Sequence, residues 1–454
     1  MSSTAVATAV KELAPAFAGR LIQPVDALFN DARMVHNGLI DRKPALIAQC
    51  RGVADIADAV KLARKLRLEI AVRGGGHNVA GRGTIDGGLL IELSLMKGVH
   101  VDPGKRVARV EGGALWREVN RETQVHGLAT TGGIIGSTGV AGLTLGGGLG
   151  WLMAKHGMAL DNVLSVEVVT ADGTVRRAAA DENPDLFWAV RGGGGNFGVV
   201  ASFEFQLHPV GPMITGGLVA HPIERAKDVL RFFRETTRTL PDEMMMVAGL
   251  VTGPDGTTKL AALVAGHFGS LEDGAAATLP IKQFGQPIMD VIGPMPYTAI
   301  NSMLDASTPR GARNYWKSHF IDDLSDAAID TLIDRAMRAP SPLCQLLLEH
   351  FHGKATRVPP TETAYALRSP GYNMLVLGQW TNPADDAKGL AWSRDSYAAM
   401  QPHVSAKRYL NYMGEDEGDT LLGSVYGPNL ARLRQVKAKF DPENVFHVNV
   451  NIKP

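Results

Sequence analysis

The chain has 454 residues, of which 45% are hydrophobic, so it can form two or three domains around a large core. Its 46 basic residues balance its 46 acidic ones, and no basic stripe interleaved with aromatic residues occurs, which argues against nucleic acid or an anionic membrane as a partner. The two cysteines, Cys50 and Cys344, lie far apart in apolar surroundings, which excludes a disulfide framework and a cysteine zinc site and predicts buried thiols.

The N-terminal residues 1–30 are expected to be a loosely attached lead-in. They lack the charged start and the long apolar core of a secretory signal, and no apolar stretch of about 20 residues occurs further along the chain. We therefore expect a cytoplasmic protein without a membrane-spanning segment. The sequence leaves its oligomeric state open between a monomer and a homodimer.

The first half of the chain alternates helical and strand patterns. Apolar residues recur at helical spacing from residue 53 to residue 68, and a second helix is expected at 113–126. Short apolar runs predict strands at 68–72, 89–93, 108–111 and 165–169. This alternation predicts an α+β nucleotide-binding region that ends near Pro209.

The second half changes in texture. Residues 224–239 and 325–338 are amphipathic and predict helices, the second of which begins after the N-cap Ser325. Strands are expected at 343–352 and 374–380. An antiparallel sheet flanked by helices is the arrangement that these elements favour.

Three glycine-rich runs, at 73–78, 130–150 and 191–200, are the strongest functional signal. Adjacent glycines carry no Cβ atom, so backbone N–H groups in such turns can approach a large anionic ligand closely. The three runs indicate one extended ligand that several loops contact. The first two do not fit the Gly-x-Gly-x-x-Gly pattern followed by an acidic residue, so a Rossmann dinucleotide fold is not favoured.

The motifs in these runs resemble a known family. In chain order they are Arg-Gly-Gly-Gly-His-Asn at 73–78, Gly-Gly-Gly-Leu-Gly-Trp-Leu at 146–152, Asp-Asn-Val-Leu at 161–164, and Leu-Phe-Trp-Ala-Val-Arg-Gly at 186–192. Together they are similar to the FAD-linked oxidases of the vanillyl-alcohol oxidase type. Tyr-Leu-Asn-Tyr at 409–412 and the segment 441–449 resemble the C-terminal part of the berberine-bridge-enzyme branch.

This resemblance runs from about residue 40 to the C-terminus and implies an α+β fold in three segments. Residues 1–209 and 404–454 would form a two-part FAD-binding domain of the p-cresol methylhydroxylase (PCMH) type. Residues 210–403 would form an inserted substrate domain, an antiparallel sheet flanked by helices.

The implied function is an FAD-dependent oxidase. Such an enzyme transfers a hydride from a small-molecule alcohol or amine to the flavin, and oxygen reoxidises the flavin to give hydrogen peroxide. The sequence leaves open whether the substrate is an alcohol or an amine. A flavin dehydrogenase with a different acceptor and a non-catalytic flavin-binding protein are the alternatives.

The resemblance also implies how FAD is held. The histidine at the position of His77 bonds covalently to the flavin 8α-methyl in the family, and many members add a second link from a cysteine in the middle glycine run. Residues 131–150 contain no cysteine, so a single link through His77 is expected. For the same reason we do not expect the wide-open substrate site of doubly linked members. The predicted cofactor-binding residues are Arg73, Gly74, Gly75, Gly76, His77, Asn78, Gly136, Ser137, Gly139, Gly142, Gly146, Gly198, Val200 and Asn449.

Tyr409, Tyr412 and Glu349 are the predicted catalytic residues. In related alcohol-oxidising members a tyrosine of the C-terminal motif lies over the flavin. Read as a strand, residues 409–412 would direct the two tyrosines to opposite faces, and the sequence does not decide which one faces the flavin.

The strand expected at 343–352 carries polar residues on both faces. Glu349 would share one face with Gln345 and Leu347, and His350 would share the other with His352. An apolar surrounding would raise the pKa of Glu349 and suit it to act as a general base, whereas a solvated face would make it an ordinary surface residue. The two histidines lack an evident third ligand, so no metal site is expected.

Overall fold

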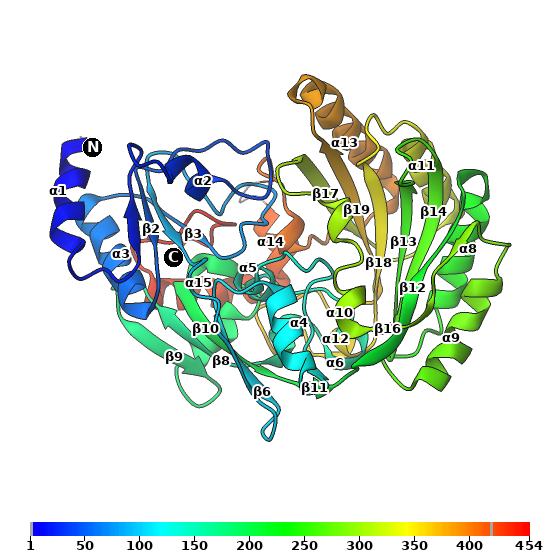
Figure 1. The fold of residues 1–454 in the computed structure, drawn as a ribbon, viewed down its shortest axis with the longest axis horizontal. Coiled ribbons are helices and arrows are strands. Elements are labelled where there is room, and N and C mark those ends of the chain that lie inside the picture. The colour runs from blue at the N-terminus through cyan, green and yellow to red at the C-terminus, as the bar shows by residue number, and fades with distance from the viewer. Residues whose placement is uncertain (1–2, 418–420) are drawn as a thin grey trace.

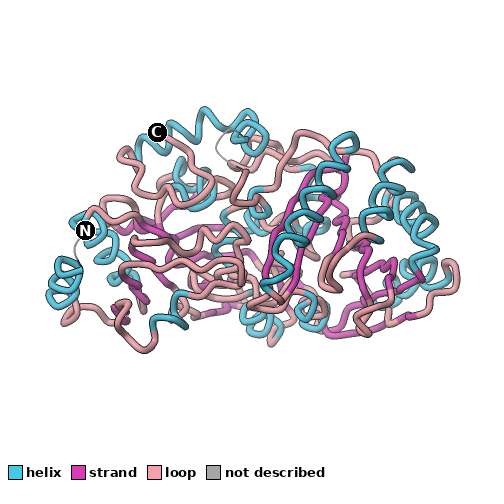
Figure 2. The backbone as a smooth tube through the Cα atoms, turned by 90° about the horizontal axis from the view of Figure 1, so that it is seen from above, coloured by secondary structure: helices cyan, strands magenta, loops and turns pink. Residues whose placement is uncertain are grey.

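The protein consists of two sheet-based halves that lie side by side along the long axis of the molecule (Figure 1). The computed structural model describes residues 3–417 and 421–454. Both chain ends lie in the N-terminal half, as Figure 1 and the perpendicular view in Figure 2 show. No helix within the described ranges is long and apolar enough to cross a membrane.

The first sheet of the N-terminal half is small and mostly parallel. Its order is β1-β2-β4-β3, in which β2 and β3 run parallel to β4 and β1 is antiparallel to β2. The predicted helix between β2 and β3 is present and ends at Leu66, because Arg67 adopts a left-handed backbone conformation with φ 51°. The elements are α1 (Ser3–Leu13), β1 (Arg20–Ile22), α2 (Phe29–Arg33), β2 (Leu46–Gln49), α3 (Val53–Leu66), β3 (Ile70–Arg73) and β4 (Leu89–Glu92).

A second, antiparallel sheet completes the N-terminal half. Its order is β5-β6-β10-β8-β9. The glycine-rich run 130–150 lies between β6 and β8, and the run 191–200 leads into the start of β10. The elements are β5 (Val99–Asp102), β6 (Val107–Glu111), α4 (Trp116–Gln124), α5 (Val140–Leu145), β8 (Val163–Val169), β9 (Val175–Ala179), α7 (Pro184–Val190) and β10 (Val199–Gln206). Short elements accompany them: β7 (Leu128–Ala129), α6 (Met153–His156) and β11 (His208–Pro209).

The other half is built on an antiparallel sheet of eight strands, which confirms the expected arrangement. The order is β15-β12-β14-β13-β18-β19-β17, and β16 pairs with β12. The strands are β12 (Met213–Pro222), β13 (Met244–Thr252), β14 (Lys259–His267), β15 (Met289–Asp290), β16 (Gly293–Pro296), β17 (Arg313–Ile321), β18 (Gln345–Phe351) and β19 (Gly371–Trp380).

Helices cover one face of this large sheet, on the outer side of the molecule (Figure 1). The main ones are α8 (Ala226–Thr237), α9 (Leu271–Gln283), α11 (Asp326–Met337) and α13 (Asp386–Met400), and α10 (Tyr297–Ile300) and α12 (Lys354–Arg357) are single turns. The hydroxyl of Ser325 accepts a hydrogen bond from the backbone N–H of Ala328, so the predicted N-cap of α11 is confirmed. The other face of the sheet points toward the N-terminal half.

The C-terminal segment returns to the N-terminal half through α14 (Leu422–Tyr426) and α15 (Leu430–Phe440), which pack into the core of its sheets. Asn196 of the third glycine run fixes the chain end, because its amide donates to the carbonyl of Val450 at 3.1 Å and accepts from the N–H of Ile452 at 2.9 Å. The two-part organisation of the first domain is therefore present. The boundaries at residues 209 and 404 stay predictions.

Candidate active site

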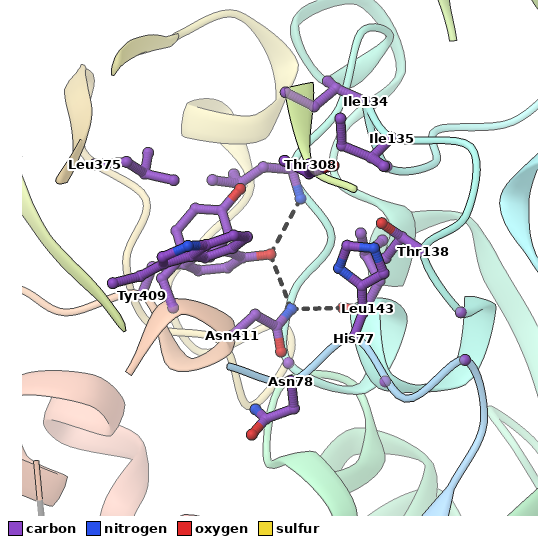
Figure 3. A pocket seen from close by; sticks show the side chains of 18 of the residues that line it. His77, Asn78, Ile134, Ile135, Thr138, Leu143, Thr308, Leu375, Tyr409 and Asn411 are labelled. Carbon is purple, nitrogen blue, oxygen red and sulfur yellow. Dashed lines mark hydrogen bonds between the residues drawn. The ribbon is translucent and has the colours of Figure 1, made fainter. Parts of the chain in front are cut away.

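A cavity of about 830 Å³ lies between the two halves. Its walls come from the three glycine-rich runs, the inner face of the large sheet, and a single 3₁₀ turn, η7 (Leu410–Tyr412). Figure 3 shows part of this cavity, with His77 and Tyr409 both reaching into it from different halves of the chain. The structure thus brings the three glycine runs to one site, as their spacing predicts.

The first two glycine runs contact each other backbone to backbone. A Cβ atom added at Gly75 would lie 2.5 Å from the nitrogen of Gly139, and one added at Gly139 would lie 2.3 Å from the nitrogen of Gly75. Real Cβ atoms do not come this close, so both positions require glycine. The close approach sets the spacing of the loops that form this end of the cavity.

His77 lies in the cavity wall and is held on two sides. Its Nε2 lies 3.1 Å from the hydroxyl of Ser137, and its ring stacks on the ring of His36 at a centroid distance of 3.9 Å. Burial, and to a smaller extent the neighbouring His36, lower the pKa of His77 from 6.5 to about 3. The imidazole is therefore neutral at physiological pH, with a lone pair on one ring nitrogen.

The predicted cofactor residues fall into two groups. Gly136 and Ser137 lie outside the cavity lining, and the N–H of Gly136 donates to the carboxylate of Asp305 at 2.7 Å. The guanidinium of Arg73 points away to the carbonyls of Ala32 and Met34, so only part of this residue is available to a ligand. The residues that line the cavity are Arg73, Gly74, Gly75, Gly76, His77, Asn78, Gly139, Gly142, Gly146, Gly198, Val200 and Asn449.

The expected strand at 409–412 is wrong, because the turn η7 occupies this position. A 3₁₀ helix has three residues per turn, so Tyr409 and Tyr412 share a side and both line the cavity. The hydroxyl oxygen of Tyr409 accepts hydrogen bonds from the N–H groups of Gly148 at 2.9 Å and Leu149 at 3.2 Å, and from the amide of Asn411 at 3.0 Å. Figure 3 shows the bonds that Asn411 makes to Tyr409 and to the Leu143 carbonyl. Tyr409 is thereby fixed at the second glycine run.

Glu349 is buried in the cavity wall, which excludes a solvated face for this residue. Its side chain is 3% exposed, and burial raises its pKa from 4.5 to about 7. The amide of Asn373 donates to one carboxylate oxygen at 2.6 Å, and the hydroxyl of Tyr412 donates to the other at 3.3 Å. Burial and the neighbouring Glu349 raise the pKa of Tyr412 well above its usual value, so this tyrosine stays protonated.

The strand β18 has the alternation that the sequence predicts. Gln345, Leu347 and Glu349 line the cavity, whereas the intervening Leu346 and Leu348 pack into the helix-covered core. The rings of His350 and His352 stack on each other with a centroid distance of 4.2 Å, and both residues lie outside the cavity lining. Neither histidine belongs to a group of three or more potential metal ligands in the described part of the chain. Both cysteines are buried, as predicted, and burial raises the pKa of each thiol.

Comparisons with known proteins agree with this geometry. A family profile described as "FAD binding domain" matches residues 44–179, and one described as "Berberine and berberine like" matches residues 408–453. An (R)-6-hydroxynicotine oxidase from Paenarthrobacter nicotinovorans is 31% identical, with 96% of this chain and 97% of the relative covered. The chain belongs to the berberine-like FAD-linked oxidoreductases.

Further relatives support this family assignment. An FAD-linked oxidoreductase from Dictyostelium discoideum is 30% identical, with 90% of this chain and 89% of the relative covered. The crystal structure of 6-hydroxy-D-nicotine oxidase from Arthrobacter nicotinovorans matches with a TM-score of 0.88 at 28% identity, with 96% of this chain and 98% of that chain covered. The expected FAD-binding fold and the FAD-dependent oxidoreductase class are confirmed.

The residues of this oxidoreductase fit FAD. Gly142 and Gly195 line the cavity, and a Cβ atom at either position would meet no described atom within 4 Å apart from its own chain neighbours and helix backbone, so the backbone there faces open space. Asn449 also lines the cavity, and its side-chain oxygen has no hydrogen-bond partner among the described residues. Bare backbone and an unpaired amide oxygen suit a long ligand with a pyrophosphate and polar rings.

The sequence did not point to two residues that complete the site of the berberine-like oxidoreductase. His36 stacks on His77 from a segment before the first glycine run, and Asn373 hydrogen-bonds Glu349 from the neighbouring strand β19. A polar residue inside the apolar strand Gly371–Trp380 is the signal that marks Asn373. His36 carries no comparable signal, because its contact with His77 depends on the folding of two loops.

Proposed function

We propose that the protein oxidises a small-molecule alcohol or amine, with FAD as the hydride acceptor and oxygen as the final acceptor, which yields hydrogen peroxide. The hydrogen-bonded pair of Glu349 and Tyr412 carries this proposal. It places a proton acceptor with a pKa of about 7 in the cavity that the FAD-binding loops line. A general base works best when its pKa lies near the operating pH.

Glu349 and Tyr412 divide the proton transfer in this proposal. The Glu349 carboxylate accepts the substrate proton directly, or through the Tyr412 hydroxyl, which lies 3.3 Å away. Asn373 holds the second carboxylate oxygen at 2.6 Å and fixes the orientation of the acceptor. Tyr409 has a different role, because its hydroxyl oxygen already accepts three hydrogen bonds and it positions the Gly148 loop.

We propose in addition that FAD is bound covalently, through His77 alone. The neutral imidazole, held by Ser137 and His36 in the cavity wall, supports a nitrogen nucleophile at this position. Residues 131–150 contain no cysteine, which supports a single link. The cofactor-binding residues predicted from the sequence, including those outside the cavity lining, remain part of this proposal.

A screen for peroxide release tests the proposed function. Purified protein is mixed aerobically with sugars, aromatic alcohols and cyclic amines, and hydrogen peroxide is measured. An oxidase releases peroxide with at least one of these classes. Reduction of the flavin by a substrate without peroxide release would instead indicate a dehydrogenase that uses another acceptor. The cytoplasmic location stays a prediction, and the oligomeric state stays open between a monomer and a homodimer.

A further inference from the structure

We infer that the substrate is mainly hydrocarbon and carries a single hydroxyl or amino group, and that it is not a carbohydrate. This inference rests on the proposed oxidase function and names the class of molecule that the same cavity accepts. The inference rests on the side chains with which the strands of the large sheet line the cavity, a surface called the sheet wall below. This wall faces the FAD-binding loops across the cavity.

Every long strand of the sheet wall presents an apolar side chain to the cavity. These residues are Leu218 of β12, Val247 of β13, Val264 of β14, Leu347 of β18, Leu375 of β19 and Trp316 of β17. Ile134 and Met303 continue the apolar lining from two loops. A surface of this kind binds hydrocarbon groups by removing them from water, with a gain of about 4-fold in affinity for each buried methylene.

Several polar groups of this wall have partners within the protein. The amide of Gln345 donates to the Ser307 carbonyl at 3.1 Å, and the indole N–H of Trp316 donates to the Asn314 side chain at 3.2 Å. Thr252 also lines the cavity, and its hydroxyl accepts from the ammonium of Lys259 at 3.0 Å. The wall therefore offers few free groups to a ligand with many hydroxyls.

Glu349 is the single ionisable residue among the described residues that line the cavity from the large sheet. It lies in the middle of the apolar wall, and its bond to Tyr412 marks the point where a reacting hydroxyl or amino group is recognised. A ligand hydroxyl buried elsewhere against this wall would lose its water without a replacement bond. Each such hydroxyl weakens binding about 5- to 150-fold, which a disaccharide with several hydroxyls cannot offset.

Binding and flavin reduction test the inference separately. Under anaerobic conditions, FAD-loaded protein is titrated with benzyl alcohol, 4-ethylbenzyl alcohol and 4-butylbenzyl alcohol, the matching benzylamines, glucose and cellobiose. The change in flavin absorbance reports binding, and bleaching reports oxidation. We expect Kd to fall about 4-fold per added methylene and no saturable binding of either sugar.

Binding decides the substrate class, and bleaching decides the oxidase function. Tighter binding of a sugar than of every aromatic ligand, or no gain in affinity with added methylenes, would overturn the inference. A Kd that falls with each added methylene, without bleaching by any alcohol or amine, would support the inference and count against the proposed oxidase function.

A matched pair of variants separates the wall from the rest of the fold. Val247→Thr places a hydroxyl in the cavity wall, and Val219→Thr places one on the helix-covered face of the same sheet. We expect Val247→Thr to raise the Kd for 4-butylbenzyl alcohol about 5-fold or more, and Val219→Thr to change this Kd less than 2-fold. Equal effects of both variants would overturn the inference. If either variant fails to fold, the methylene series on the wild type still decides.

Discussion

Glu349→Gln is the substitution that most sharply separates catalysis from folding. Glutamine keeps the size of the side chain, and its amide can still accept from Asn373, but it cannot accept a proton from the substrate. A positioned general base contributes about 10²- to 10⁴-fold to a rate, which corresponds to roughly 3–5 kcal/mol of barrier. We therefore expect anaerobic flavin reduction, measured by rapid mixing, to slow by that factor while FAD content stays normal.

The pH dependence of the same step identifies the group that acts. A base works in its ionised form, so the wild-type rate should rise with pH and reach a plateau above about pH 7, where Glu349 loses its proton. The Glu349→Gln variant should lack this rise. Exposed Glu182, on the surface before α7, provides the control, because Glu182→Gln removes a carboxylate without touching the cavity.

Stability distinguishes a lost base from a damaged fold. Burial raises the pKa of Glu349 from 4.5 to about 7, so the folded state loses stability from this residue as pH rises from 4.5 through 7, by about 3 kcal/mol in total. Glu349→Gln removes this loss and should unfold at pH 8 no more readily than the wild type. Near wild-type reduction, or a slow variant that also unfolds more readily at pH 8, would refute the reasoning.

Four further predictions concern the site. Tyr412→Phe removes a hydrogen bond that lowers the pKa of Glu349. Flavin reduction should slow about 10-fold or more, and its rate should rise at a higher pH than in the wild type. Tyr409→Phe should leave the pH rise in place and lower the free energy of unfolding by about 1–3 kcal/mol, as chemical denaturation would measure, because it leaves buried N–H groups unpaired. Wild-type protein should stay yellow after acid precipitation, whereas His77→Ala should release its FAD and show a lower flavin potential. Peptide mapping should find flavin only on the peptide that contains His77, and a flavinylated peptide with Cys50 or Cys344 would contradict the single link.

Local signals in the sequence predicted most of the framework. The glycine-rich runs predicted one shared site, and residues of all three runs line one cavity. The helices α3 and α11 lie where apolar periodicity and the Ser325 cap indicate. The alternation along β18 also predicted which of its residues face the cavity, since side chains in a strand alternate between the two faces. The helices and the alternation along β18 depend on residues that are close together in the chain.

The rest of the site depends on contacts between distant segments. Glu349 and Tyr412 are 63 residues apart, and no local pattern shows that the turn η7 brings the tyrosine to β18. Strand alternation separated Tyr409 from Tyr412, but the 3₁₀ turn places them on one side. The raised pKa of Glu349 likewise follows from burial between strands and loops, which the sequence alone left as one of two alternatives.

A double-mixing experiment tests the central claim most directly. FAD-loaded protein is first mixed anaerobically with an alcohol or amine that it binds, and then with oxygenated buffer, while flavin absorbance and hydrogen peroxide are followed. The account predicts that the flavin bleaches in the first step and recovers in the second, with one hydrogen peroxide formed for each flavin reoxidised. Bleaching without recovery in oxygen, or no bleaching by any bound alcohol or amine, would contradict it.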